Sequence, residues 1–275
     1  FTILVSIPIL GIRPTKRRGQ HFLADPNLAR AIVADADVHE GDLVLEVGAG
    51  LGSLTVPLAE AGCRVLAVEV DRGLANALRE VVAPYPNVRI EVADAMRLDW
   101  PSMLGAGRWS MVSNLPYNVS VPLVLELLET APAIDRYVVM VQREVGERLV
   151  AGPGAEGYGA VSVRVAYHAD ARVVRRVPAD VFWPRPKIDS VLVRLEPRAP
   201  AVDVDRGALF AVVNEGFAER RKTMANALRR LGLDPASAAG VLRSAGLDPS
   251  ERAEQLGLDG FARITETMLE RGWTP

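Results

Sequence analysis

The segment Asn114-Leu115-Pro116-Tyr117 combines residue types that could act on an aromatic amine. The amide oxygen of Asn114 and the carbonyl oxygen of Leu115 could accept the two hydrogens of an exocyclic amine such as N6 of adenine. Two such acceptors favour a tetrahedral nitrogen, whose lone pair can then attack a methyl group. Pro116 holds Leu115 in an extended conformation and offers no competing N–H, and Tyr117 can stack on an extruded base. A proline-containing turn with a core tyrosine is the alternative interpretation.

A glycine-rich turn precedes this segment in the chain, with the sequence Glu46-Val47-Gly48-Ala49-Gly50-Leu51-Gly52. Glycines let the backbone approach a ligand closely and adopt dihedral angles closed to other residues. Glu69 ends the next apolar run, where a carboxylate can hold both hydroxyls of a ribose. The pattern indicates a nucleotide cofactor but does not separate NAD from S-adenosylmethionine. A structural turn and a surface glutamate are the alternative.

A third apolar run ends at Ala93-Asp94-Ala95. Asp94 could accept a hydrogen bond from the exocyclic amine of a cofactor adenine, and Ala95 leaves room for the ring. Taken alone, Asp94 is equally well explained as a helix N-cap. In series with Gly48 and Glu69, it favours the ligand interpretation.

These residues follow predicted strands in an alternating strand–helix pattern. Strands are expected at 43–47, 64–70, 88–92, 110–113 and 137–142, and helices at 53–61, 72–82, 121–128, 144–150 and 161–167. Two further β-rich stretches, 171–177 and 190–195, close this part of the chain. The pattern predicts an α/β fold with a doubly wound, mostly parallel sheet and an antiparallel addition.

The two ends of the chain differ from this α/β pattern. A Pro- and Ala-rich linker at 197–201 is followed only by helical patterns. We therefore expect a catalytic domain over 1–197 and a small all-α, RNA-binding domain over 198–275. The apolar run 1–12 lacks the basic region and cleavage site of a secretory leader and is too short to span a bilayer. We expect it to pack on the first domain.

Composition narrows the function classes. The single cysteine, Cys63, excludes an internal disulfide and a cysteine-based zinc site, and the three histidines lack metal-ligand spacing, so no metal is expected. A reducing, cytoplasmic location is the default expectation. The formal net charge of −2 means that any nucleic acid must be held by local basic patches.

Three segments together resemble the ribosomal RNA adenine dimethyltransferase family: Gly19–Leu23, Asn114–Ser120 and Val181–Ser190. The resemblance runs from Pro14 to about Leu231. It is strongest to the bacterial enzymes that dimethylate two adjacent adenines near the 3′ end of small-subunit rRNA. It implies a Rossmann-like class I methyltransferase fold and S-adenosyl-L-methionine as the cofactor.

The resemblance also implies roles for individual residues. The family often has asparagine where this chain has His21, whose imidazole can still hydrogen-bond the methionine portion of the cofactor. Phe182 is expected to stack on the target adenine opposite Tyr117, and a core phenylalanine is the alternative. The candidate catalytic residues are Asn114, Leu115, Pro116, Tyr117 and Phe182. The candidate cofactor-binding residues are His21, Leu23, Gly48, Gly50, Glu69, Asp94, Ala95 and Asn114.

Three basic clusters support an RNA partner, because clustered cations neutralise phosphates. They are Arg13, Lys16, Arg17 and Arg18; Arg172, Arg175, Arg176, Arg185 and Lys187; and Arg220, Arg221, Lys222, Arg229 and Arg230. A solvated helix face equally explains any one cluster. The expected partner is small-subunit rRNA within the immature 30S subunit. We expect no contact with a membrane, and we expect the protein to be monomeric.

Other functions compete with this interpretation. A large-subunit rRNA adenine methyltransferase that confers antibiotic resistance would share the fold and the pocket. A mainly non-catalytic checkpoint factor of small-subunit assembly belongs to a different class, and the intact Asn-Leu-Pro-Tyr segment argues against lost activity. A DNA adenine methyltransferase fits less well, because its usual motif differs at the second position.

Overall fold

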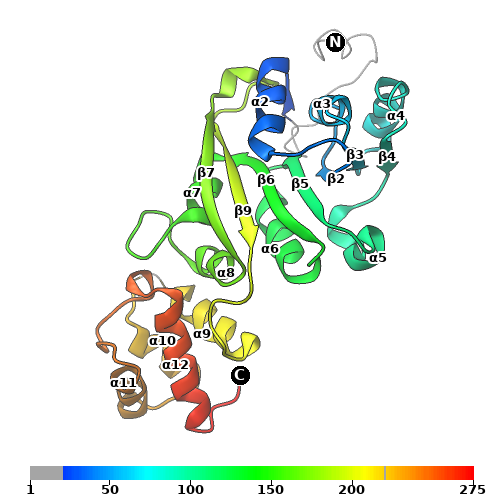
Figure 1. Cartoon of the computed structure of the whole chain (residues 1–275). Coiled ribbons are helices and arrows are strands. Elements are labelled where there is room, and N and C mark those ends of the chain that lie inside the picture. Colours follow the sequence, from blue (N-terminus) through cyan, green and yellow to red (C-terminus); the bar gives the residue numbers. More distant parts are fainter. Residues whose placement is uncertain (1–20, 220) are drawn as a thin grey trace. The chain divides into compact units, whose positions relative to one another are not determined.

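The computed structural model describes residues 21–219 and 221–275. These residues form two compact units (Figure 1). The first holds the described residues up to Gly146 together with Ala171–Pro197, and the second holds Glu147–Asp170 and Arg198–Pro275. The apolar run 1–12, the first basic cluster and Arg220 lie outside the described residues.

A seven-stranded sheet forms the centre of the first unit, with strand order β4-β3-β2-β5-β6-β9-β7. Strands β2 to β6 run parallel, and β9 pairs antiparallel with β6. This arrangement confirms the predicted α/β fold with an antiparallel addition. The strands are β2 (Leu43–Val47), β3 (Arg64–Val68), β4 (Val88–Glu91), β5 (Trp109–Asn114), β6 (Ile134–Gln142), β7 (Ala169–Val177) and β9 (Ser190–Pro197).

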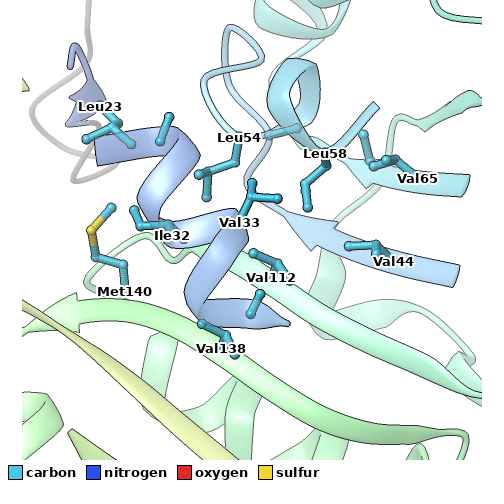
Figure 2. Packing of buried hydrophobic residues seen from close by; sticks show 14 of the residues in the cluster. Leu23, Ile32, Val33, Val44, Leu54, Leu58, Val65, Val112, Val138 and Met140 are labelled. Carbon is cyan, nitrogen blue, oxygen red and sulfur yellow. The ribbon is translucent and has the colours of Figure 1, made fainter. Parts of the chain in front are cut away.

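Helix α2 (Pro26–Ala36) was not predicted, although its start is marked in the sequence. The Asp25 side chain accepts hydrogen bonds from the amides of Asn27 and Leu28, and Pro26 occupies the first helical position. Its apolar face, with Ile32 and Val33, joins the core cluster beside strands β5 and β6 (Figure 2). The remaining helices of this part are α3 (Thr55–Glu60), α4 (Arg72–Val81), η2 (Ala95–Arg97), α5 (Trp100–Leu104), α6 (Ser120–Thr130) and η3 (Ala179–Val181). Helix α7 (Arg143–Val150) begins in the first unit, and its residues from Glu147 onward belong to the second.

A second, two-stranded sheet joins segments that are far apart in sequence. Strand β1 (Phe22–Leu23) pairs antiparallel with β8 (Phe182–Trp183), with Phe22 opposite Trp183 and Leu23 opposite Phe182. The hydroxyl of Ser53 donates to the Leu23 carbonyl at 2.9 Å, which ties this sheet to the chain just after the glycine turn. Two of the three family-like segments therefore meet here.

The second unit is all-helical, as predicted for the C-terminal part, but it begins earlier than the linker suggested. Tyr158, Val163 and Tyr167 lie in the same core cluster as Leu209 and Phe261, so 147–170 groups with this unit. The chain enters this unit twice, first at Glu147 and again at Arg198, within the linker at 197–201. Its helices are α8 (Ala160–His168), α9 (Arg206–Ala218), α10 (Met224–Arg230), α11 (Pro235–Ser244), η4 (Ala253–Gln255) and α12 (Leu258–Glu270).

Within the described residues, none of the helices has the length and apolar character needed to cross a membrane. The same residues contain no group of three or more His, Cys, Asp or Glu side chains that could hold a metal ion.

Candidate active site

A cavity of about 290 Å³ lies where strands β2, β3, β4 and β5 end. Ligands of doubly wound folds bind at the carboxyl ends of the strands, because the loops that follow parallel strands converge there. Every predicted site residue except Phe182 lines this cavity. The structure therefore brings the glycine turn, Glu69, Asp94 and the Asn-Leu-Pro-Tyr segment together.

The glycine turn forms one wall of the cavity and requires glycine at two positions. Gly48 has φ +78°, and a Cβ there would lie 3.1 Å from Cδ of Pro116. Gly50 has φ +55°, and its Cβ would lie 3.1 Å from the Phe22 ring. Larger residues at these positions would face both backbone strain and close contacts. The turn can thus pack directly against the Asn-Leu-Pro-Tyr segment.

Glu69 lies at the end of β3 and is held by backbone amides. One carboxylate oxygen accepts from Gly50 and the other from Asp71, both at 2.9 Å. The side chain is 6% exposed, and burial raises its pKa, while the bonds from Asp71 and Gly50 lower it. Because each carboxylate oxygen can accept more than one hydrogen bond, Glu69 keeps capacity for the hydroxyls of a ribose.

Glu46 is a cavity-lining residue to which the sequence interpretation assigned no role of its own. It is 2% exposed, and the Thr55 hydroxyl donates to its carboxyl group at 2.6 Å. Burial raises the pKa of Glu46 to about 8 against the lowering effect of the Thr55 bond, and the charge of Glu69 adds to the rise. The sequence does mark Glu46 as unusual, because it is a charged residue inside an otherwise apolar strand.

Asn114 is oriented by a hydrogen bond to the main chain. Its Nδ2 donates to the carbonyl of His21 at 3.0 Å. This bond orients the amide group, and with it the side-chain oxygen, which is a hydrogen-bond acceptor. The Leu115 amide donates to the Met140 carbonyl at 3.1 Å, and the Leu115 side chain is 1% exposed. Both residues that supply the expected acceptors are therefore held in place at the cavity.

His21 and Tyr117 form a stacked pair beside Asn114. Their ring centroids are 5.2 Å apart at an interplanar angle of 30°. The Nδ1–H of His21 donates to the Pro184 carbonyl at 2.6 Å, and the Tyr117 hydroxyl shares a hydrogen bond with Ser190 at 3.3 Å. Burial raises the pKa of Tyr117, so its hydroxyl stays protonated. These contacts connect all three family-like segments.

Asp94 caps a short helix and also lies at the cavity. Its carboxylate caps η2 by accepting from the Met96 amide at 3.1 Å, and it lies 3.6 Å from Nε of Arg97. It also lines the cavity, as does Ala95, which is 9% exposed.

The expected position of Phe182 needs correction. Phe182 is 4% exposed, belongs to the core cluster with Leu23 and Ile32, and does not line the cavity. Side chains alternate along a strand, so Phe182 points into the core and the next residue, Trp183, is 37% exposed. The core alternative is the one that the structure shows.

Several residues of the basic clusters are already paired. Arg175 makes a two-pronged contact with Asp35, at 2.5 and 3.0 Å, and Arg172 lies 3.5 Å from Glu196. Their carboxylate partners already neutralise these cations in part, so they would bind a phosphate less strongly than unpaired arginines. Arg185 and Lys187 are exposed, and among the described residues no ion pair involves either of them.

In the second unit, Arg230 pairs with both Glu215 and Glu219. Arg221 and Lys222, in contrast, are exposed, and no ion pair of the described residues involves them. The acidic partners of these clusters lie between 11 and 140 residues away in the sequence, so a count of basic residues does not reveal the pairs.

Together, the sheet order and the cavity define a class I methyltransferase fold. The sequence matches the family described as ribosomal RNA adenine dimethylase over residues 13–269. The chain belongs to this family and is an enzyme.

Curated relatives and solved structures agree with this family. Ribosomal RNA small subunit methyltransferase A from Moorella thermoacetica is 43% identical, covering 94% of this chain and 93% of that protein. Its counterpart from Thermobifida fusca is 47% identical, covering 94% and 91%. A dimethyladenosine transferase from Plasmodium falciparum, 23% identical, covers 92% of this chain and 99% of its own with a TM-score of 0.79. The 23S rRNA methyltransferase ErmE, 25% identical, covers 90% and 98% with a TM-score of 0.69.

Proposed function

We propose that this enzyme adds two methyl groups to N6 of each of two adjacent adenines near the 3′ end of small-subunit rRNA. The methyl donor is S-adenosyl-L-methionine, and the substrate is the small-subunit rRNA within the immature 30S subunit. The enzyme acts in the cytoplasm as a monomer. The proposal rests mainly on the position of Asn114. Its amide group is fixed by the His21 carbonyl, and it lines the same cavity as Gly48 and Glu69.

The similarity pattern supports the small subunit over the large one. Relatives named as small-subunit enzymes are 43% and 47% identical to the chain, whereas the 23S enzyme is 25% identical. The large-subunit alternative is therefore not favoured.

The cavity suits the proposed donor. Gly48 and Gly50 leave space that a Cβ would fill, and the Glu69 carboxylate is positioned by two amides to accept ribose hydroxyls. Asp94 and Ala95 line the same cavity, and we assign them to the adenine ring of the donor. Bound there, the donor supplies an electrophilic methyl group. The residues that hold it are His21, Leu23, Gly48, Gly50, Glu69, Asp94, Ala95 and Asn114.

The residues of the Asn-Leu-Pro-Tyr segment prepare the acceptor. The Asn114 side-chain oxygen and the Leu115 carbonyl accept the two amine hydrogens, which withdraws the nitrogen lone pair from conjugation with the ring. Tyr117, held by His21 and Ser190, stacks on the extruded adenine. No strong general base is needed, because the nitrogen loses its proton only after the new N–C bond has formed. Catalysis rests on positioning.

A substrate comparison tests the proposal. The purified protein is incubated with tritiated S-adenosylmethionine and, separately, immature small subunits, mature small subunits, naked small-subunit rRNA and large-subunit rRNA. We expect label in the immature small subunits, and mass analysis should find dimethyladenine at two adjacent positions. Label confined to large-subunit rRNA, or no label in any RNA, would refute the assignment.

A further inference from the structure

The loop that follows β8 presents an aromatic ring and two cations to solvent. Trp183 is 37% exposed, and it is the one aromatic residue among the large apolar side chains exposed in the described part of the chain. Arg185 and Lys187 follow it and are also exposed. An exposed indole offers a flat apolar face on which another ring can stack.

Strand pairing places Trp183 next to a strand that borders the cavity. It lies directly opposite Phe22 in the β1–β8 pair, and Phe182 lies opposite Leu23. Both Phe22 and Leu23 line the cavity. Trp183 is therefore the exposed residue of the strand that pairs with the cavity-lining strand β1.

The loop is also fastened to the tyrosine that stacks on the target base. The carbonyl of Pro184, next to Trp183, accepts from His21 at 2.6 Å, and His21 stacks on Tyr117. Pro184 and Pro186 each fix their φ angle, so they restrict the backbone around Arg185. The loop thus holds the ring and the two cations near the cavity with little conformational freedom to lose on binding.

We propose that Trp183 stacks on the base next to the target adenine in the RNA strand, while Arg185 and Lys187 contact the flanking phosphates. The proposal rests on the proposed function and extends it to the neighbouring nucleotide. When an adenine leaves its stack, the adjacent base loses a stacking partner, and an exposed indole replaces it. An aromatic face beside backbone-tracking cations is the combination that binds single-stranded nucleic acid.

Fluorine NMR tests this contact without relying on activity. The full-length protein is labelled with 5-fluorotryptophan at its four tryptophans and titrated with a single-stranded RNA carrying the 3′-terminal small-subunit sequence. Loss of one resonance in the Trp183→Phe variant assigns that signal. We expect the Trp183 signal to shift on RNA addition, while Trp100 and Trp109, 1% and 9% exposed, serve as unshifted references.

Steady-state kinetics provide the second readout. Trp183→Ala should raise the KM for RNA by at least about fivefold with little change in kcat, because the lost stacking affects binding. Trp183→Tyr, which keeps an aromatic face, should stay within about twofold of the wild type. Ile188→Ala is the matched control, since Ile188 is an exposed apolar residue of the same loop, at 40%, without a ring. Thermal unfolding midpoints establish that each variant is folded.

An unshifted Trp183 signal, or an unchanged KM in Trp183→Ala, would overturn the stacking proposal while wild-type methylation of the same RNA upholds the proposed function. If the wild type methylates no small-subunit RNA at all, the proposed function fails instead. The NMR shift then still decides whether Trp183 binds RNA.

Discussion

At the scale of the residue, Glu46 has the most perturbed environment of the site. Burial raises its pKa to about 8 from an ordinary value of 4.5, so the folded state holds a proton that the unfolded chain releases between these values. Its contribution to stability therefore falls as pH rises through this window, by at most about 1.4 kcal/mol per pH unit. Gln at this position keeps an acceptor for Thr55 and does not titrate.

The first prediction follows from this difference. Glu46→Gln should gain stability relative to the wild type as pH rises from 5 to 8, with the difference levelling off above pH 8. Urea denaturation of both proteins at pH 5, 6.5 and 8 measures it. Parallel pH dependences for the two proteins would show that Glu46 does not hold the extra proton.

A second prediction concerns the His21 ring. Its stack on Tyr117 and its bond to Pro184 are lost in His21→Ala, whereas His21→Phe keeps a ring and loses only the bond. We expect His21→Ala to lower kcat/KM for RNA by about fivefold, which corresponds to about 1 kcal/mol of ring contact, and His21→Phe to lie between it and the wild type. Equal activity of His21→Ala and wild type would exclude a positioning role for the ring.

Residues that follow strands were accessible from the sequence, because glycine turns and polar strand ends have recognisable patterns. Gly48, Glu69 and Asn114 all lie in the cavity as expected. The direction of Phe182 was not accessible, because it depends on pairing with Leu23, a residue far away in the chain. The buried state of Glu46 likewise depends on neighbours that only the fold supplies.

At the scale of the element, helix α7 packs against strand β9 through a glycine. A Cβ on Gly146 would lie 2.2 Å from Val191 and 3.0 Å from Val193, in both cases from a stiff, branched side chain. Helical propensity favours alanine over glycine by about 1 kcal/mol. The clash should outweigh this gain.

The third prediction is that Gly146→Ala destabilises the protein by about 1–3 kcal/mol. Gly240→Ala in helix α11 is the matched control, because its Cβ would meet only the flexible end of Arg271, at 3.3 Å. Gly240→Ala should be neutral or slightly stabilising. Chemical denaturation of both variants tests the pair, and an equal effect of the two substitutions would contradict the packing argument.

Most strands were predicted within a few residues, since buried parallel strands are short apolar runs with clear ends. Helix α2 was missed although Asp25 and Pro26 mark its start. The strands β1 and β8 have two residues each, too few for any periodicity to register. Short elements of this kind form because tertiary partners exist, and a local pattern does not contain those partners.

At the scale of the whole molecule, the helical unit is predicted to bind RNA through its unpaired cations. Arg221→Ala combined with Lys222→Ala should reduce the slope of log affinity against log salt concentration by about 1–2, since each phosphate contact contributes about 0.7–0.9. Arg230→Ala is the control, because Glu215 and Glu219 already neutralise Arg230. Filter binding of rRNA at several salt concentrations measures the slopes. A larger effect of Arg230→Ala would reverse this assignment.

The all-α character of the C-terminal part was predicted from its helical patterns, but the extent of the second unit was not. Tyr158 and Tyr167 join its core from a segment that, in sequence, continues the strand–helix alternation of the first unit. The hydrophobic core to which a helix contributes depends on side-chain packing, which a local sequence pattern does not contain. The ion pairs that occupy Arg175 and Arg230 were hidden for the same reason.

In the proposed mechanism, the side-chain oxygen of Asn114, whose amide group is fixed by the His21 carbonyl, accepts a hydrogen of the adenine amine during methyl transfer. The most direct measurement is the single-turnover rate of Asn114→Ala on immature small subunits, with the product nucleosides identified by mass analysis. We expect a rate at least about 100-fold below wild type, with dimethyladenine absent and the unfolding midpoint unchanged. A folded Asn114→Ala protein that forms dimethyladenine at the wild-type rate would contradict this mechanism.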